Sequence, residues 1–421
     1  MTEKAMRPSL RFDGFTDAWE QRKVGELLTE RNEQAPMSEE YPLMAFIANE
    51  GVAPKGDRYD RSSLVSDTEN KPYKKTDFGD FIYSSNNLET GSIGLNKYGK
   101  ASISPVYSIF QPTGIADSDF LGRRLVRKDF INAMVKWRQG VIYGQWRIHE
   151  SDFAKIEIPV PTVEEQRQIG AFLDSLDNLI TLHQRKYDKL INLKKAMLEK
   201  MFPEKGEVVP KIRFSGFTDA WEQRKLGEVL ISLQNNTLSR AELTTEGGTA
   251  FDVHYGDVLI KFGGYLDIKK ELLPMIMDGA LPTKYKASFL HNGDVIVADT
   301  AEDETVGKCS EIAGLTDEIV ISGLHTIPYR PLFKFASGYL GYYMNSTSYH
   351  HQLFPLMQGI KVTSISKSAM QNTIIYYPKS EGEQAEISTY FRNLDNLITL
   401  HQRELEKMQN IKKACLEKMF I

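Results

Sequence analysis

One stretch of the chain combines positive charge with aromatic side chains, as contact with nucleic acid requires. Between residues 123 and 147, seven lysine and arginine side chains face a single acidic residue, Asp129, which leaves a net charge of +6. Trp137, Tyr143 and Trp146 are interleaved with them. Cationic groups neutralise phosphates and fix a protein on a duplex. The predicted DNA-binding residues in this stretch are Arg123, Arg124, Arg127, Lys136, Arg138 and Arg147.

A second stretch, from Ile319 to Ser380, contains no Asp or Glu. It carries ten aromatic residues together with scattered basic ones. The pattern favours DNA contact, but a solvated face above an aromatic core would give the same composition. The predicted DNA-binding residues here are Arg330, Lys334, Lys361 and Lys367.

Two predicted loops, at residues 84–97 and 299–308, follow short strand-like runs and carry polar side chains. Asparagine pairs well with adenine and lysine with guanine, so Asn86, Asn87 and Lys97 are predicted to read base edges. The second loop carries three acidic residues in succession, which repel phosphates and weaken its case. Polar residues after strands also serve plain turn chemistry, and that alternative stays open.

The chain shows no motif for making or breaking bonds. It contains no Gly-Lys-Ser or Gly-Lys-Thr for a P-loop, and Cys309 and Cys415 are too few for a four-cysteine zinc site. His350 and His351 are adjacent without a nearby third ligand, so we predict no metal site and no catalytic residue. The net charge of -4 argues mildly against nucleic acid, although the distribution of charge matters more than its sum. With no long apolar stretch, we expect a cytoplasmic protein without a membrane partner.

The elements that must position these residues are duplicated. Residues 11–25 and 213–227 are identical at thirteen of fifteen positions. Residues 176–185 recur unchanged at 394–403. The period is near 200 residues, far beyond a solenoid repeat, so the chain is a duplicated pair of domains.

Between these blocks, residues 36–158 and 238–377 differ almost everywhere. They share only short signals, such as a Gly-Asp pair before a strand in each half. The order is therefore framework segment, variable domain and helical block, twice over. The predicted division is 1–160 for the first variable domain with its repeated segment 11–34, 161–203 for the first spacer helix, 204–379 for the second variable domain with its repeated opening 213–230, and 380–421 for the second spacer helix.

Each helical block begins with a start signal. Thr162 and Glu165, like Ser380 and Glu383, have the spacing of a capping box. The first helix is predicted to run up to Pro203, and at 1.5 Å per residue it would be about 60 Å long.

Residues recur along both helical blocks at alternating steps of four and three, and most of them are apolar, which indicates a coiled coil. Such a stripe needs a partner, and the other copy in antiparallel orientation is the natural one, although packing inside one domain would also bury it. The predicted fold class is α+β, with two globular mixed α/β domains joined by two long antiparallel coiled-coil helices and an internal pseudo-two-fold duplication. The predicted seam residues are Leu173, Leu176, Ile180, His183, Tyr187, Leu190, Phe391, Leu394, Ile398, His401, Leu405 and Met408.

The whole layout resembles the specificity subunit of Type I restriction-modification enzymes. The residues that carry the resemblance in the first copy are Pro159, Pro161, Glu165, Gln166, Ile169, Phe172, Leu173, Leu176 and Asp177. The second copy matches them with Pro378, Glu383, Gln384, Ile387, Phe391, Leu394 and Asp395, but it lacks the Pro-x-Pro pattern. The repeat openings with Trp19 and Trp221 fit as well.

The resemblance implies that each variable domain is a target recognition domain that reads one half of a bipartite, asymmetric site in double-stranded DNA. The spacer helices would set the gap and dock two methyltransferase subunits, and motor-nuclease subunits would join for cleavage. No cofactor would sit on this chain: S-adenosylmethionine would belong to the methyltransferase, and ATP and magnesium to the motor-nuclease. The sequence leaves two alternatives open, a non-catalytic coiled-coil scaffold with two protein-binding heads, and an enzyme with an unrecognised active site.

Overall fold

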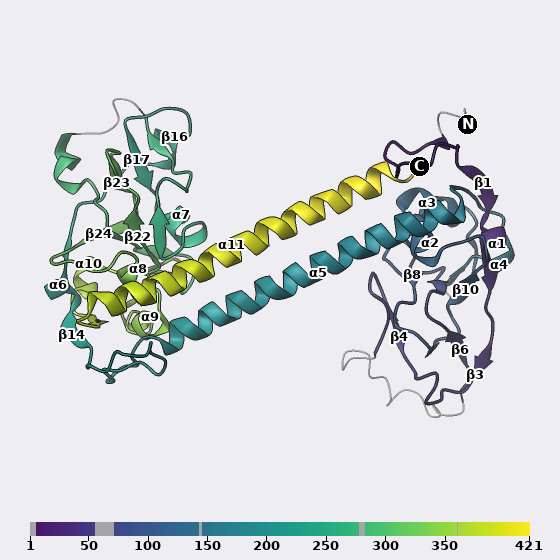
Figure 1. The fold of residues 1–421 in the computed structure, drawn as a ribbon, viewed down its shortest axis with the longest axis horizontal. Helices are drawn as coiled ribbons and strands as arrows, with labels where there is room; N and C mark the ends of the chain where they lie inside the picture. The colour runs from purple at the N-terminus through teal and green to yellow at the C-terminus, as the bar shows by residue number, and fades with distance from the viewer. Residues whose placement is uncertain (1–5, 55–70, 143–144, 278–282, 360) are drawn as a thin grey trace. The chain divides into compact units, whose positions relative to one another are not determined.

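The computed structural model describes residues 6–54, 71–142, 145–277, 283–359 and 361–421. It divides into two compact units. The first unit comprises residues up to Leu182 together with Leu405–Ile421, and the second comprises His183–Glu404. Each unit therefore contains one variable domain, called here a head, with parts of both long helices (Figure 1).

The first head is built on an antiparallel sheet of order β2-β10-β7-β8. Its strands are β2 (Leu28–Glu30), β10 (Ser108–Pro112), β7 (Phe81–Tyr83) and β8 (Ile93–Leu95). All three residues of β7 are buried. The rings of Tyr83 and Phe110 lie 4.9 and 4.6 Å from that of Phe153, so aromatic packing fixes the side of the sheet where the core lies.

Shorter elements complete the first unit. A framework ribbon pairs β1 with β13, a three-stranded sheet has the order β3-β6-β9, and two hairpins join β4 to β5 and β11 to β12. The elements are β1 (Glu20–Lys23), α1 (Val24–Leu27), β3 (Gln34–Ala35), β4 (Ala45–Ile47), β5 (Gly51–Ala53), β6 (Tyr73–Thr76), β9 (Ala101–Ile103), α2 (Ser118–Arg124), α3 (Lys128–Val135), β11 (Gln139–Ile142), β12 (Gln145–Arg147), α4 (Glu150–Phe153) and β13 (Glu157–Val160).

The second head repeats this strand order although its sequence is unlike the first. Its central sheet has the order β15-β24-β20-β22-β18, in which the first four strands correspond to β2-β10-β7-β8 and β18 is an added parallel strand. The strands are β15 (Leu230–Ser232), β24 (Thr326–Pro331), β20 (Val295–Ala298), β22 (Cys309–Ala313) and β18 (Tyr265–Asp267). A Gly-Asp pair directly precedes a central strand in each head, β7 in the first and β20 in the second. The two heads thus share one framework.

The remaining elements of the second unit surround that sheet. The ribbon β14-β26 repeats β1-β13, and a four-stranded sheet has the order β16-β19-β17-β23. The elements are β14 (Glu222–Lys225), α6 (Leu226–Val229), η4 (Arg240–Glu242), β16 (Leu243–Thr244), β17 (Ala250–Val253), α7 (Tyr255–Ile260), β19 (Met275–Ile276), η5 (Thr283–Ser288), β21 (Thr300–Ala301), β23 (Val320–Ser322), α8 (Tyr339–Met344), α9 (Thr347–His350), η6 (Phe354–Leu356), β25 (Thr363–Ser364), α10 (Lys367–Met370) and β26 (Ile374–Tyr377).

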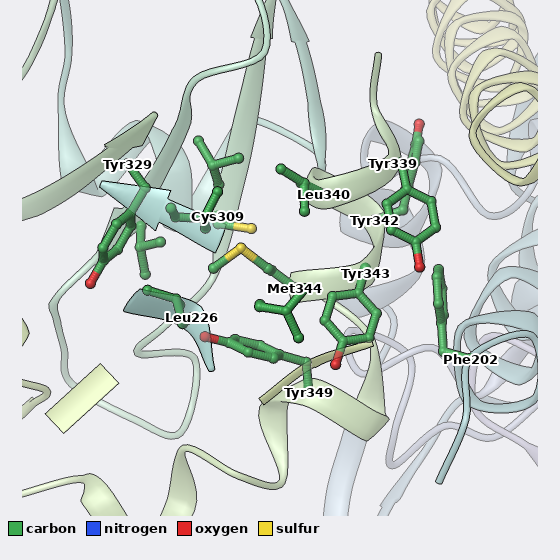
Figure 2. Packing of buried hydrophobic residues seen from close by; sticks show 14 of the residues in the cluster. Phe202, Leu226, Cys309, Tyr329, Tyr339, Leu340, Tyr342, Tyr343, Met344 and Tyr349 are labelled. Atoms are coloured by element: carbon green, nitrogen blue, oxygen red, sulfur yellow. The ribbon is translucent and has the colours of Figure 1, made fainter. Parts of the chain in front are cut away.

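The aromatic residues of the acid-free stretch largely belong to this core. Tyr339, Tyr343 and Tyr349 are fully buried, and Phe202, at the end of the first long helix, packs 5.5 Å from the ring of Tyr343 (Figure 2). The phenol groups remain satisfied because Tyr339 and Tyr343 donate to the carbonyls of Tyr376 and Ile374. The aromatic half of that sequence pattern therefore reflects packing, the alternative that the composition had left open.

The two long helices are α5 (Val163–Lys200) and α11 (Glu381–Lys418), each of 38 residues. The predicted helix starts are correct, and the hydroxyls of Thr162 and Ser380 accept the N–H groups three residues on. The other half of each predicted capping box is wrong. The carboxylate of Glu165 accepts two hydrogen bonds from Arg11 at 2.8 and 2.6 Å instead. The carboxylate of Glu383 accepts two hydrogen bonds from Arg213 in the same way.

Within each unit the helices pair in antiparallel orientation, as predicted. In the first unit Lys412 reaches Asp177 at 2.5 Å, and in the second Lys194 reaches Asp395 at 2.5 Å. These two ion pairs occupy the same positions of the two repeats, 218 residues apart. The seam residues nearest the heads, Leu173, Leu176, Phe391 and Leu394, are buried, as is Leu405. The half-buried ones are Ile180, His183, Tyr187, Leu190, Ile398, His401 and Met408.

Candidate nucleic-acid interface

In the first head, the loop after β7 is joined to the β11–β12 hairpin. The Arg138 guanidinium donates to the carbonyl of Ser85 at 3.1 Å and makes two hydrogen bonds to Glu89 at 2.8 and 2.6 Å. The backbone N–H of Trp146 donates to Asn86 Oδ1 at 2.6 Å. We call residues 85–89, 138–142 and 145–148 the first edge. Two residues predicted to contact DNA, Asn86 and Arg138, therefore meet here and hold the loop against the hairpin.

Other predicted residues project from the first edge or lie beside it. The side chain of Arg147 is 68% exposed, and Trp146 beside it is 44% exposed. Asn87 and Lys136 are also exposed. An exposed guanidinium next to an exposed indole can meet phosphates and base edges together. The first edge thus presents cationic, aromatic and amide groups to solvent.

A hollow of about 770 Å³ lies beside the first edge. Asn86, Trp146 and Arg147 contribute to its lining, and Ser108 and Lys74 line it from neighbouring strands. Sequence reasoning missed Lys74, because a lysine in a strand carries no local sign of whether it is buried.

The other basic candidates of the first head contact the long helices. Lys97 lies 3.1 Å from Asp119 and also pairs with Asp174, and Arg123 pairs with Asp174 and Asp177 at 3.1 and 2.7 Å. These pairs fasten the head to α5. As DNA contacts both residues stay predictions.

Two further arginines of the stretch 123–147, Arg124 and Arg127, are also held by neighbouring groups. Arg124 is only 4% exposed and pairs with Asp129, and Arg127 donates to the carbonyl of Leu416 and lies 5.5 Å from the ring of Phe420. Burial of Arg124 lowers the pKa of its guanidinium. The basic residues of this stretch therefore do not form one continuous cationic face, because Arg123 and Arg138 pair with acids far away in the sequence and Arg124 pairs with the nearby Asp129.

In the second unit, the basic candidates are also placed by nearby groups. Arg330 makes a two-pronged contact with the buried Asp294 at 3.0 and 2.6 Å. In the first head the corresponding aspartate, Asp80, also has an arginine beside it, since Arg31 Nε lies 2.9 Å from its carboxylate. Lys334 pairs with Glu381 at 2.5 Å. The ammonium of Lys367 lies 3.5 Å from the carbonyl of Leu233, and Lys361 is exposed.

The second head carries an edge at the same place in its topology. The strand β21 pairs with β25, and the N–H of Ile365 donates to the carbonyl of Asp299 at 2.9 Å. His325, with a left-handed φ of 58°, places Nδ1 at 3.7 Å from Asp299 Oδ1 and at 3.5 Å from Thr300 Oγ1. We call residues 299–301 and 363–365, with His325, the second edge. Its acid, hydroxyl and imidazole groups contrast with the arginine, tryptophan and asparagine of the first.

No metal cluster lies beside these edges in the described part of the chain. Among the described ranges, no three or more His, Cys, Asp or Glu side chains gather in a group that could hold a metal ion. Within the same ranges, no helix has the length and apolar character needed to cross a bilayer.

The duplicated framework defines a known class. Residues 16–192 and 218–410 match the model of the Type I restriction modification DNA specificity domain, so both repeats are covered. The chain belongs to this family, and it is a Type I restriction-modification specificity subunit, as the sequence resemblance indicated.

Among its relatives is the Type I restriction enzyme MjaVIII specificity subunit of Methanocaldococcus jannaschii, which is 26% identical over 333 residues, 77% of this chain and 74% of the relative. The putative MjaX specificity subunit of the same organism is 23% identical over 282 residues, 65% of this chain and 60% of that one. A solved S subunit from M. genitalium shares the fold, with a TM-score of 0.52 and 14% identity over 99% of both chains.

Proposed function

We propose that each head reads one half of a bipartite, asymmetric site in double-stranded DNA. The observation that carries this proposal is the presence of two edges at the same point of one shared framework with unlike side chains. Arg147 and Trp146 project from the first edge, whereas Asp299 and His325 lie at the second. Since base readout depends on the donors and acceptors presented, unlike edges favour unlike half-sites.

The long helices would set the gap between the half-sites and dock two methyltransferase subunits. Leu179 and Leu182 on α5 are exposed, and their repeat counterparts Leu397 and Leu400 on α11 are exposed as well. Exposed apolar pairs on a helix favour a protein partner. Because each unit carries the same pair, the two sites suit two copies of one partner.

This chain would contribute recognition without catalysis. S-adenosylmethionine would bind the methyltransferase subunits, and ATP and magnesium would bind motor-nuclease subunits in the full complex. The composition of the first edge supports this division, since its arginine and asparagine side chains are those of phosphate and base contact.

Mapping adenine methylation across the genome, with and without this gene and with the methyltransferase gene present, tests the proposal. Deletion of the gene should abolish methylation of one gapped motif and so reveal both half-sites. An unchanged methylation map would contradict the proposal and would favour a scaffold with two protein-binding heads.

A further inference from the structure

A lysine on β6 lies beneath the first edge. Lys74 is paired in register with Ile103 of β9 and with Gln34 of β3, and the residue is only 7% exposed. It nevertheless lines the hollow beside the first edge, together with Ser108, Trp146 and Arg147. The strand thus holds a mostly buried lysine at the wall of an open polar hollow.

The charge of Lys74 has no counter-charge in the described part of the chain, where no carboxylate oxygen lies within 4.0 Å of its ammonium nitrogen. Its neighbour Lys75, which points to the other face of β6, pairs with Glu33 at 2.8 Å. The carboxylate that lines the hollow, Glu150, accepts a hydrogen bond from Ser108 at 2.8 Å and lies 3.9 Å from Arg147. An ammonium without a counter-charge at the wall of a hollow is available to bind an anion that enters from outside.

We propose that Lys74 binds a phosphodiester of the DNA backbone in this hollow. The inference rests on the proposed function and adds a positioning contact to it. A recessed cation is poorly placed to reach base edges in a groove, whereas a phosphate ridge protrudes from the duplex into a hollow. Lys74 would therefore fix the orientation of the first head, and the groups of the first edge that face solvent would meet the bases.

The test uses the complex of the full chain with its methyltransferase subunits and a duplex carrying the mapped site. Each phosphate of the first half-site is replaced in turn by an uncharged methylphosphonate, and affinity is measured for the wild type, Lys74→Met, Lys74→Arg and the control Lys75→Met. Methylphosphonate substitution at one position should lower the affinity of wild type and of Lys74→Arg about tenfold, which is the scale of one charged hydrogen bond. The same substitution should leave the affinity of Lys74→Met unchanged. The salt dependence of Lys74→Met binding should fall by about 0.9 in log–log slope while the methylated motif is unchanged.

Three results would overturn the inference. If methylphosphonate substitution lowered the affinity of Lys74→Met and of wild type equally at every phosphate, a contact between Lys74 and the DNA backbone would be excluded. Relaxed discrimination at one base pair in Lys74→Met would make Lys74 a base reader. Stabilisation of wild type, but not of Lys74→Met, by inorganic phosphate, without any responsive position in the DNA, would indicate a small-anion site. If the wild-type complex bound no gapped site, the proposed function itself would fail. A normal melting temperature for Lys74→Met excludes misfolding as the cause of its altered DNA binding.

Discussion

His183 and His401 place their Nδ1 atoms 3.1 Å apart where α5 and α11 pair in the second unit. They occupy the same position of the two repeats, 218 residues apart, so one histidine meets its own duplicate. Only a neutral ring nitrogen can accept the proton that the other donates. Burial and then the charge of His183 lower the pKa of His401, with Lys186 contributing in the same direction. The helix pair thus contains a contact that acid should weaken.

Acidification should destabilise this contact. Because the folded-state pKa of His401 is lowered, the unfolded chain binds more protons near its ordinary pKa, and stability falls as the pH drops through that range. The melting temperature of wild type should therefore fall more than that of the double variant His183→Leu, His401→Leu when the pH is lowered from about 7.5 to about 5.5. Parallel pH profiles for the two proteins would contradict the prediction.

Loss of the buried clamp at the start of α5 should be strongly destabilising. Glu165 is 1% exposed and takes both of its hydrogen bonds from Arg11, so Glu165→Gln leaves the guanidinium uncompensated. We expect a cost of about 3 kcal/mol in the free energy of unfolding, measured by urea titration. The matched control is Glu164→Gln, since Glu164 lies in the same helical turn but is exposed. Similar effects of the two substitutions would show that the clamp is unimportant.

Substitutions at the two edges should separate the two half-sites. Arg147→Ala should relax base specificity only in the first half of the motif, with a loss of about 1–3 kcal/mol of discrimination at one base pair. His325→Asn should affect only the second half, and asparagine is chosen because it tolerates the left-handed φ of that position. The methylated motif is the measurement. Arg224→Ala, at an exposed arginine of the framework ribbon, is the control, and a change in both halves from either edge variant would refute independent reading.

Lengthening the spacer helices should widen the gap. One heptad added to each helix keeps the seam in phase and adds about 10 Å, so the gap should grow by up to about three base pairs. Insertion of two residues instead rotates the seam by about 200° and should impair folding or assembly. An unchanged gap in the methylation map of the heptad variant would rule out the helices as a ruler.

Asp252 should make the second head lose stability as the pH rises from about 4 to about 6. It is 1% exposed, its Oδ2 accepts from Asn236 at 2.6 Å, and burial raises its pKa to about 6. The folded state then binds more protons than the unfolded chain, so stability is lost as pH rises through about 6. Asp252→Asn should remove that loss and melt at a higher temperature than wild type at about pH 8. A lower melting temperature for the variant would show that the ionised carboxylate is needed.

The duplicated order of framework, head and helix could be predicted from the sequence alone. So could the starts of both long helices and their antiparallel pairing. Identity between repeats and the period of an apolar stripe are local properties that do not depend on distant contacts. The family resemblance followed from the same blocks, because the framework that repeats is the part that the family shares.

The use of each charge was decided only by the tertiary structure. Arg123 looks cationic in the sequence, but its partners Asp174 and Asp177 are more than fifty positions away. Lys74 and Lys75 are adjacent, yet the alternation of the strand buries one at the hollow and pairs the other with Glu33. Composition counts charges, whereas only the packing of distant segments determines which of them are neutralised inside the protein and which remain for a ligand.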